Sequence, residues 1–171
     1  MSPSRHPLAR AFILAVRNAN PSGPQPRLVM LGDGPLLAQV RGLLQEAGMA
    51  HLAWLPGARD DVARVMRGMD LFVLPSLAEG VSNTILEAMA SGLPVVIADL
   101  PGARGVSRDG DHGVHVAPGD LDDLVRGVRA LVDAGRDGRR RKGEAARAHV
   151  VEHYAWARCA ELLEAVYEEI V

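Results

Sequence analysis

Short apolar runs alternate with segments of helical periodicity along this sequence, and no other feature constrains the fold as strongly. The apolar runs cover residues 28–31, 51–55, 71–74, 95–98 and 114–116. Alternating strands and helices build βαβ units, and right-handed crossovers place such helices on both faces of a parallel sheet. We therefore predict the α/β class, with a doubly wound parallel sheet at about residues 8–118 and helices at about residues 119–171.

The first predicted element is a helix over residues 8–16, although a doubly wound domain ordinarily opens with a strand. In the commonest strand order, 3-2-1-4-5-6, the first strand lies at the centre of the sheet. Residues 1–7, MSPSRHP, do not have the sequence of a strand. We expect a sheet that lacks its first strand and has a gap in the middle.

Composition and charge narrow the function classes. The 171 residues, 48% of them hydrophobic, fit one domain, and the net charge of -2 gives no electrostatic reason to expect nucleic acid. Neither a signal peptide nor an apolar run of bilayer length is evident, so we expect a soluble, cytoplasmic protein. Cys159 is the single cysteine, which we interpret as a packed or partly exposed thiol.

The stretch EGVSNTILEAMASGLPVV, residues 79–96, carries the main functional signal. Ser82 or Asn83 is a predicted side-chain cap for a helix that Gly92 closes, and a buried strand follows. Ligands of open α/β sheets bind beyond the carboxyl ends of the strands, where helix N-termini point, and a phosphate suits such an N-terminus. Glu87, one turn inside the helix, can accept hydrogen bonds from both hydroxyls of a ribose.

Glu79 precedes the same helix, and Gly80 lets a ligand approach the backbone closely. We interpret the two glutamates as groups that hold two polyols joined by a diphosphate. The pair, within LPSLAEGVSNTILEAMASGLPVVIAD, resembles the signature of family 4, or group 1, retaining glycosyltransferases of the GT-B fold. Further likeness lies in LVMLGDGP, LAWLPGARDDV, DGDHGVHVAPGD and EAARAHVVEHYAW, so the resemblance covers nearly all of the chain from about residue 8.

The resemblance implies a Rossmann-like domain that binds a nucleotide sugar, a UDP- or GDP-sugar, and transfers the sugar with retention and without a metal or other cofactor. It makes Glu79 the catalytic residue that contacts the donor sugar and Glu87 the ribose ligand. The remaining implied binding residues are Gly80, Val81, Ser82, Asn83, Thr84 and Ile85 beside the diphosphate, with Gly32, Gly34, Leu55 and Arg59 lining the cleft and the base.

Two departures from the family pattern matter. First, the family's basic residues that neutralise the diphosphate belong to its first strand and the loop after it, and this part is absent here. The family's N-terminal acceptor-binding domain is absent as well, and we expect it in the same gene product or another chain. Membrane contact is expected only through those missing parts, and no nucleic acid is expected. In LPGARGVS, Pro101 and Gly105 stand where the family has a glycine and a glutamate.

Other interpretations stay open. A stand-alone nucleotide or nucleotide-sugar binding module is the first alternative, and an epimerase fragment of similar fold is a weaker one. His112 with His115, and His149 with His153, have spacings that suggest metal sites, but we favour turn, strand and solvated helix positions for them. We interpret the basic run at residues 138–142, GRRRK, as a charged solvent face.

Overall fold

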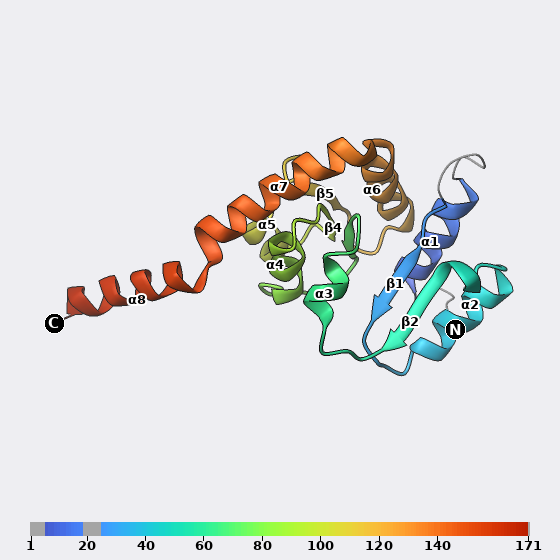
Figure 1. Ribbon diagram of the computed structural model, residues 1–171, viewed down its shortest axis with the longest axis horizontal. Helices are drawn as coiled ribbons and strands as arrows, with labels where there is room; N and C mark the ends of the chain where they lie inside the picture. The colour runs from blue at the N-terminus through green and yellow to red at the C-terminus, as the bar shows by residue number, and fades with distance from the viewer. Residues whose placement is uncertain (1–5, 19–24, 171) are drawn as a thin grey trace.

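The computed structural model describes residues 6–18 and 25–170, and in this part of the chain parallel strands alternate with helices as predicted (Figure 1). Residues 1–5, from which no strand was expected, lie outside the described residues. The strands are β1 (Leu28–Leu31), β2 (Ala53–Gly57), β3 (Phe72–Leu74), β4 (Val95–Ala98) and β5 (Gly113–Val116). The helices are α1 (Pro7–Arg17), α2 (Leu37–Glu46), η1 (Ala50–Leu52), α3 (Val62–Met66), α4 (Asn83–Ala90), α5 (Pro101–Val106), α6 (Leu121–Asp133), α7 (Gly135–Tyr154) and α8 (Trp156–Ile170).

The strands form two sheets. One has the order β1-β2 and the other β3-β4-β5, and every pairing is parallel. In a sheet of order 3-2-1-4-5-6, the second and fourth strands flank the first. Among the described strands, β1 and β3 do not pair with each other, so the sheet is divided at the position where the gap was expected.

The strand β4 is buried along its whole length because it lies between β3 and β5. Its side chains alternate between the two faces of the sheet. Val95 and Ile97 pack in a cluster with residues of α4, α5 and α7, whereas Val96 packs in another with residues of α1 and α6. Helices thus cover both faces of this sheet, as the doubly wound class requires.

A third cluster fills the space between α1, α2 and the β1–β2 sheet. Its buried members are Ala9, Phe12, Leu28, Val40, Leu44 and Leu52. Because α1 contributes residues to this cluster and to the α6 cluster, it packs against both sheets.

Several boundaries differ from the sequence predictions. The predicted strand at residues 51–55 begins two residues later, because residues 50–52 form a turn of 3-10 helix that directs Leu52 into the core. The short helices α3 and α5 were not predicted. The sequence predicts a basic helix at about residues 139–151, and α7 begins four positions earlier, at Gly135.

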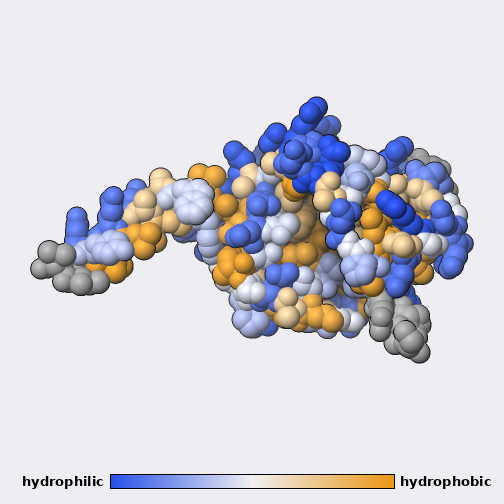
Figure 2. Space-filling view, turned by 90° about the horizontal axis from the view of Figure 1, so that it is seen from below, coloured by the Kyte–Doolittle hydropathy of each residue, from blue (hydrophilic) through white to orange (hydrophobic). Residues whose placement is uncertain are grey.

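At the end of the chain, α8 projects from the body with apolar side chains on its surface (Figures 1 and 2). Trp156 is 90% exposed, and the other large exposed apolar residues are Leu162, Leu163, Val166 and Tyr167. None of the described helices is both long and apolar enough to cross a membrane.

Candidate functional site

The junction between β3 and α4 forms the centre of the candidate site. The strand ends at Leu74, and α4 begins at Asn83. The first helical hydrogen bonds run from the amides of Ile85 and Leu86 to the carbonyl oxygen of Ser82, at 3.1 and 3.2 Å. The amides before Ile85 thus have no place in the helical hydrogen-bond pattern, which leaves this end suited to an anion.

The two glutamates lie on the exposed surface around this junction. Glu79 Oε1 accepts a hydrogen bond from Ser76 Oγ at 2.8 Å, which orients the carboxylate within its loop. Glu87 is exposed, while Ile85, Ala88 and Met89 bury the opposite face of α4 in the core. Burial of that face fixes the rotation of the helix and keeps the Glu87 carboxylate in solvent.

The residues between the two glutamates differ in what they present to solvent. Val81 is 63% exposed and Asn83 and Thr84 are exposed, whereas Ser82 and Ile85 are buried. The Ile85 side chain is buried, and its amide already donates to the carbonyl oxygen of Ser82. The predicted side-chain cap is wrong: Ser82 occupies the N-cap position, but its hydroxyl makes no capping hydrogen bond.

The helix α5 backs the glutamate loop. A Cβ atom at Gly102 would lie 1.9 Å from the carbonyl oxygen of Gly80, so the two backbones are in direct contact. The sequence LPGARGVS therefore forms a helix that begins at Pro101 and packs on the loop. Gly105, which replaces the family's glutamate, accepts a hydrogen bond from Tyr154 Oη at 2.6 Å.

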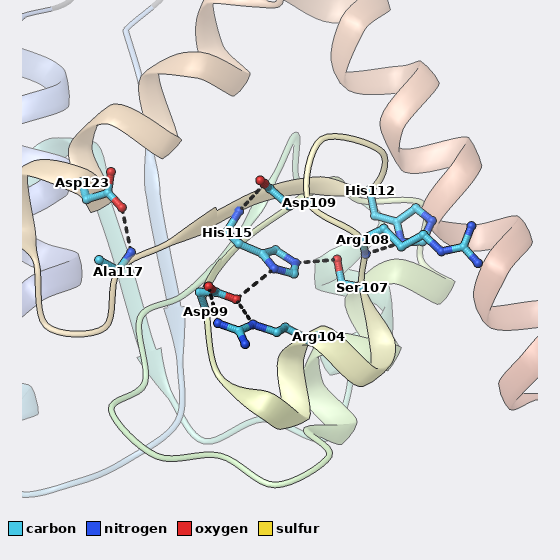
Figure 3. A network of polar contacts seen from close by, with 9 residues as sticks. All are labelled: Asp99, Arg104, Ser107, Arg108, Asp109, His112, His115, Ala117 and Asp123. Carbon is cyan, nitrogen blue, oxygen red and sulfur yellow. Dashed lines mark hydrogen bonds and ion pairs between the residues drawn. The ribbon is translucent and has the colours of Figure 1, made fainter.

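A polar network fastens α5 to the ends of β4 and β5 (Figure 3). Arg104 donates two hydrogen bonds to Asp99, at 2.6 and 2.8 Å, and these bonds hold the pKa of Asp99 below its ordinary value. His115 Nδ1 lies 3.5 Å from Asp99 Oδ1, and its Nε2 lies 3.2 Å from Ser107 Oγ.

This order of serine, histidine and aspartate has the connectivity of a hydrolytic triad. Ser107, however, is only 3% exposed, so its hydroxyl is not accessible to a substrate. The network instead holds α5 in place behind the Glu79 loop. It depends on the parallel register that places His115 opposite Ile97, a relationship that sequence reasoning did not detect.

The turn at residues 32–34 and the loop after β2 form a second group of candidate residues. The amide of Gly32 donates to the carbonyl of Gly57 at 2.9 Å, and the amide of Ala58 donates to Asp33 Oδ2 at 3.1 Å. Gly32 has φ +115°, which a side chain would disfavour. Asp33 was not among the predicted site residues, yet its side chain joins the two loops. Gly34, which follows it, is exposed.

Leu55 and Arg59 occupy different surroundings in this group. The Leu55 side chain is partly buried and packs against the α1–α2 cluster. Arg59 makes paired hydrogen bonds to Asp61 at 2.6 and 2.8 Å, which lower the pKa of that carboxyl, and its guanidinium lies 5.4 Å from the ring centre of Trp54. This second group belongs to the β1–β2 sheet and the glutamate pair to the β3–β5 sheet.

The histidines divide between separate environments. His115 belongs to the Asp99 network, whereas His112 accepts a hydrogen bond from the Arg108 amide at 3.2 Å (Figure 3). The ring centre of His112 lies 4.7 Å from that of His149. His149 is therefore half-buried against the β4–β5 connection, which corrects its assignment to a solvated helix end. Within residues 6–18 and 25–170, no group of three ligating side chains has an arrangement that would hold a metal.

The basic run at the start of α7 is partly structural. Arg139 Nη1 donates to the carbonyls of Leu131 and Val132 at 3.1 Å, which caps the end of α6, and Lys142 donates to the carbonyl of Gly110. Only part of this run, including Arg140 with its partner Glu144, is the charged solvent face that was predicted.

Parallel strands, helices on both faces of the larger sheet and a helix N-terminus flanked by carboxylates define a Rossmann-like domain with a candidate anion site. A family model described as "Glycosyl transferases group 1" matches residues 6–134. The chain therefore belongs to the group 1 glycosyltransferase family.

Curated relatives are similar over most of this chain. A sulfoquinovosyl transferase from Arabidopsis thaliana is 34% identical over 136 residues, which is 78% of the chain and 26% of the relative. A phosphatidyl-myo-inositol mannosyltransferase from Mycobacterium leprae is 35% identical over 150 residues, 84% of the chain and 38% of the relative. The chain thus spans well under half the length of these relatives.

Solved structures show the same fold. The Anabaena protein HepE, in complex with UDP, superposes with a TM-score of 0.81 at 21% identity, over 96% of the chain and 45% of that protein. A sucrose-phosphate synthase from Thermosynechococcus elongatus gives a TM-score of 0.79 at 23% identity, over 97% and 43%. These likenesses confirm the predicted GT-B type of Rossmann-like domain.

Proposed function

We propose that this chain is the donor-binding part of a retaining glycosyltransferase and binds a nucleoside diphosphate sugar at the N-terminus of α4. One observation carries the proposal: Glu79 and Glu87 are both exposed on either side of that N-terminus, while the opposite face of α4 is locked in the core. A diphosphate placed between them meets the amides of residues 81–84, which precede the first helical hydrogen bond, and the positive end of the helix.

In this arrangement each glutamate has a separate task. Glu87 accepts hydrogen bonds from the ribose hydroxyls, and Glu79, oriented by Ser76, contacts the hydroxyls of the donor sugar. When the bond between sugar and diphosphate breaks, the oriented amides stabilise the charge on the leaving nucleoside diphosphate. No divalent metal is required for this step, and the base rests near Gly32, Gly34 and the loop at residues 55–59.

The acceptor is held by a second domain, in the same gene product or another chain. Relatives that are much longer than this chain support that part of the proposal. The apolar stripe of α8 supports it as well, because an amphipathic helix with an uncovered apolar face marks an interaction surface. We assign that face to the acceptor-binding domain.

The donor assignment is tested by comparing free and sugar-bearing nucleotides. Glu79→Gln should leave the affinity for the free nucleoside diphosphate within about twofold of the wild-type value. It should lower the affinity for the sugar-bearing nucleotide by about tenfold or more, since a hydrogen bond to a charged group contributes about 1.5–3 kcal/mol. Calorimetry with UDP, GDP and their glucose and mannose forms measures both affinities.

Glu46→Gln is the matched control, because Glu46 is an exposed helical carboxylate away from α4. Equal losses for both kinds of ligand in Glu79→Gln would contradict a sugar contact. Sugar transfer by the chain together with its acceptor-binding domain separates an enzyme from a binding module, because a module would hold the donor without releasing nucleoside diphosphate.

A further inference from the structure

The helix α7 is attached to the last turns of two helices that belong to the candidate site. It shares a buried cluster with α4 and α5. Arg147 Nη1 donates a hydrogen bond to the carbonyl oxygen of Ala90, the last residue of α4. Tyr154, the last residue of α7, donates one to the carbonyl oxygen of Gly105 in α5. One helix, which runs past both of the others in Figure 1, thus holds the C-terminal turns of α4 and α5.

The contact between α7 and α4 is closely packed. Gly143 of α7 lies against the carbonyl oxygen of Gly92 with no room for a Cβ atom, so the two backbones are in direct contact. Ala88 and Met89 of α4 and Ala146 of α7 are fully buried. The position of α7 relative to α4 is therefore fixed by backbone and core packing, and the end of α7 is held with it.

The helix α5 depends on contacts outside itself. It has six residues, and two of them are glycines that disfavour a helix. The last carbonyl groups of a helix have no partner within it, and Gly105 belongs to this last turn. The Tyr154 hydroxyl supplies the partner at 2.6 Å, across 49 positions of the sequence, while the tyrosine ring packs against the core cluster. Tyr154 thus caps α5 from a neighbouring helix.

The start of α5 sets the position of the glutamate loop. Gly102 is in backbone contact with the carbonyl oxygen of Gly80, the residue after Glu79. About one helical turn separates Gly102 from Gly105, where the capping hydrogen bond is made. Because α4 and α5 are both attached to α7, this bond fixes the spacing between the Glu79 loop and the helix that carries Glu87.

We propose that Tyr154 is a positioning residue for the donor sugar. Its hydroxyl holds α5 to α7, α5 holds the loop at residues 79–80, and the carboxylate of Glu79 is thereby kept at a fixed distance from that of Glu87. The inference rests on the proposed function, because the position of Glu79 matters only if Glu79 contacts the sugar. A free nucleoside diphosphate carries no donor sugar, so loss of the hydroxyl affects the sugar-bearing nucleotide selectively.

Tyr154→Phe tests this role because it removes the hydroxyl and keeps the ring that packs against the core. Calorimetry on the full chain compares UDP with UDP-glucose and GDP with GDP-mannose. The variant should lower the affinity for the nucleotide sugar by about threefold to tenfold, the effect of losing one neutral hydrogen bond, and leave the affinity for the free diphosphate within about twofold.

Val40→Ala is the control for a general loss of stability. Val40 is buried in the cluster between α1, α2 and the β1–β2 sheet, so its truncation should lower Tm without a change at α5. It should alter the affinities for the free and the sugar-bearing nucleotide by the same factor. A selective loss in Val40→Ala as well would mean that selectivity follows stability, and would overturn the role of Tyr154.

A double variant tests the route through α5. Gly102→Ala separates α5 from the glutamate loop, so adding Tyr154→Phe in that background should change the selectivity for the sugar by less than about twofold. Fully additive losses in the double variant would mean that the tyrosine acts by another route, which would also overturn the proposal.

Comparison with Glu79→Gln separates a failure of this inference from a failure of the proposed function. If Glu79→Gln loses the sugar-bearing nucleotide selectively and Tyr154→Phe does not, the role of Tyr154 alone is overturned. If neither variant discriminates between the two ligands, the sugar contact of Glu79 fails and the role of Tyr154 fails with it. Selective losses in both variants, with none in Val40→Ala, are the result that we expect.

Discussion

Gly102 and Gly80 are in backbone contact: a Cβ atom built on Gly102 would lie 1.9 Å from the Gly80 carbonyl oxygen and 3.1 Å from that of Glu79. The helix α5 therefore supports the loop that carries Glu79, the residue proposed to contact the donor sugar. Any side chain at position 102 must displace backbone, which adjusts far less readily than a flexible side chain.

Gly102→Ala should consequently separate α5 from the glutamate loop. We expect a loss of about 1–3 kcal/mol in the free energy of unfolding, the usual cost of overpacking, and a decrease of about tenfold in affinity for the nucleotide sugar. Gly105→Ala is the control in the same helix, since nothing lies within 4 Å of a Cβ at that position. If the two variants behave alike in chemical denaturation and calorimetry, the support assigned to α5 is refuted.

The paired histidines should make stability depend on pH. Burial, together with the neighbouring charge of His149, holds the pKa of His112 below its ordinary value, and burial together with His153 lowers the pKa of His149. Between these lowered pKa values and the ordinary value of about 6.5, the unfolded chain binds protons at both histidines more readily than the native chain does. The free energy of unfolding is therefore highest above about pH 6.5 and decreases as the pH falls toward the native pKa values.

His149→Gln should reduce this dependence, because it removes one such group and relieves the charge that acts on His112. His51→Gln, at an exposed position, should leave the dependence unchanged. Urea denaturation between about pH 7.5 and pH 5 measures both effects, above the range in which carboxylates titrate. A wild-type chain whose stability is constant over that range would disprove the linkage.

The exposed stripe of α8 should contribute to association and little to the stability of this chain. Leu163, which is 59% exposed, can be changed to serine at a cost within about 0.5 kcal/mol, whereas Leu131→Ser at a 1% exposed position should cost about 3 kcal/mol or more. Denaturation of the two variants gives the comparison. A large loss in Leu163→Ser would mean that α8 packs on the body of this chain.

The fold class and most elements follow from the sequence because strand and helix periods are local properties. The strands at residues 28–31 and 95–98 were predicted to the residue, since each is a short apolar run. The strand β2 was misplaced because it continues through Pro56 and Gly57, residues that disfavour strands. β2 pairs with β1 alone in the described structure, and an edge strand tolerates proline.

The supporting contacts of the site could not be predicted in the same way. The segment at residues 101–106 contains a proline and two glycines, so local propensity disfavours the helix that tertiary contacts with Gly80 and Tyr154 stabilise. The link between Asp33 and Ala58 joins loops 25 positions apart. The Asp99–His115 contact likewise requires the register of β4 with β5. The roles assigned to Glu79 and Glu87 stay predictions.

Titration of the folded chain with UDP, GDP and ADP, beside Glu87→Ala and the control Glu46→Ala, tests the central claim most directly. Circular dichroism first establishes that all three proteins fold. We predict that one nucleotide binds the wild type and Glu46→Ala alike and binds Glu87→Ala at least about tenfold more weakly, because the ribose loses hydrogen bonds to a charged acceptor. Unchanged affinity in Glu87→Ala, or a folded chain that binds none of the three, would contradict a donor site at the N-terminus of α4.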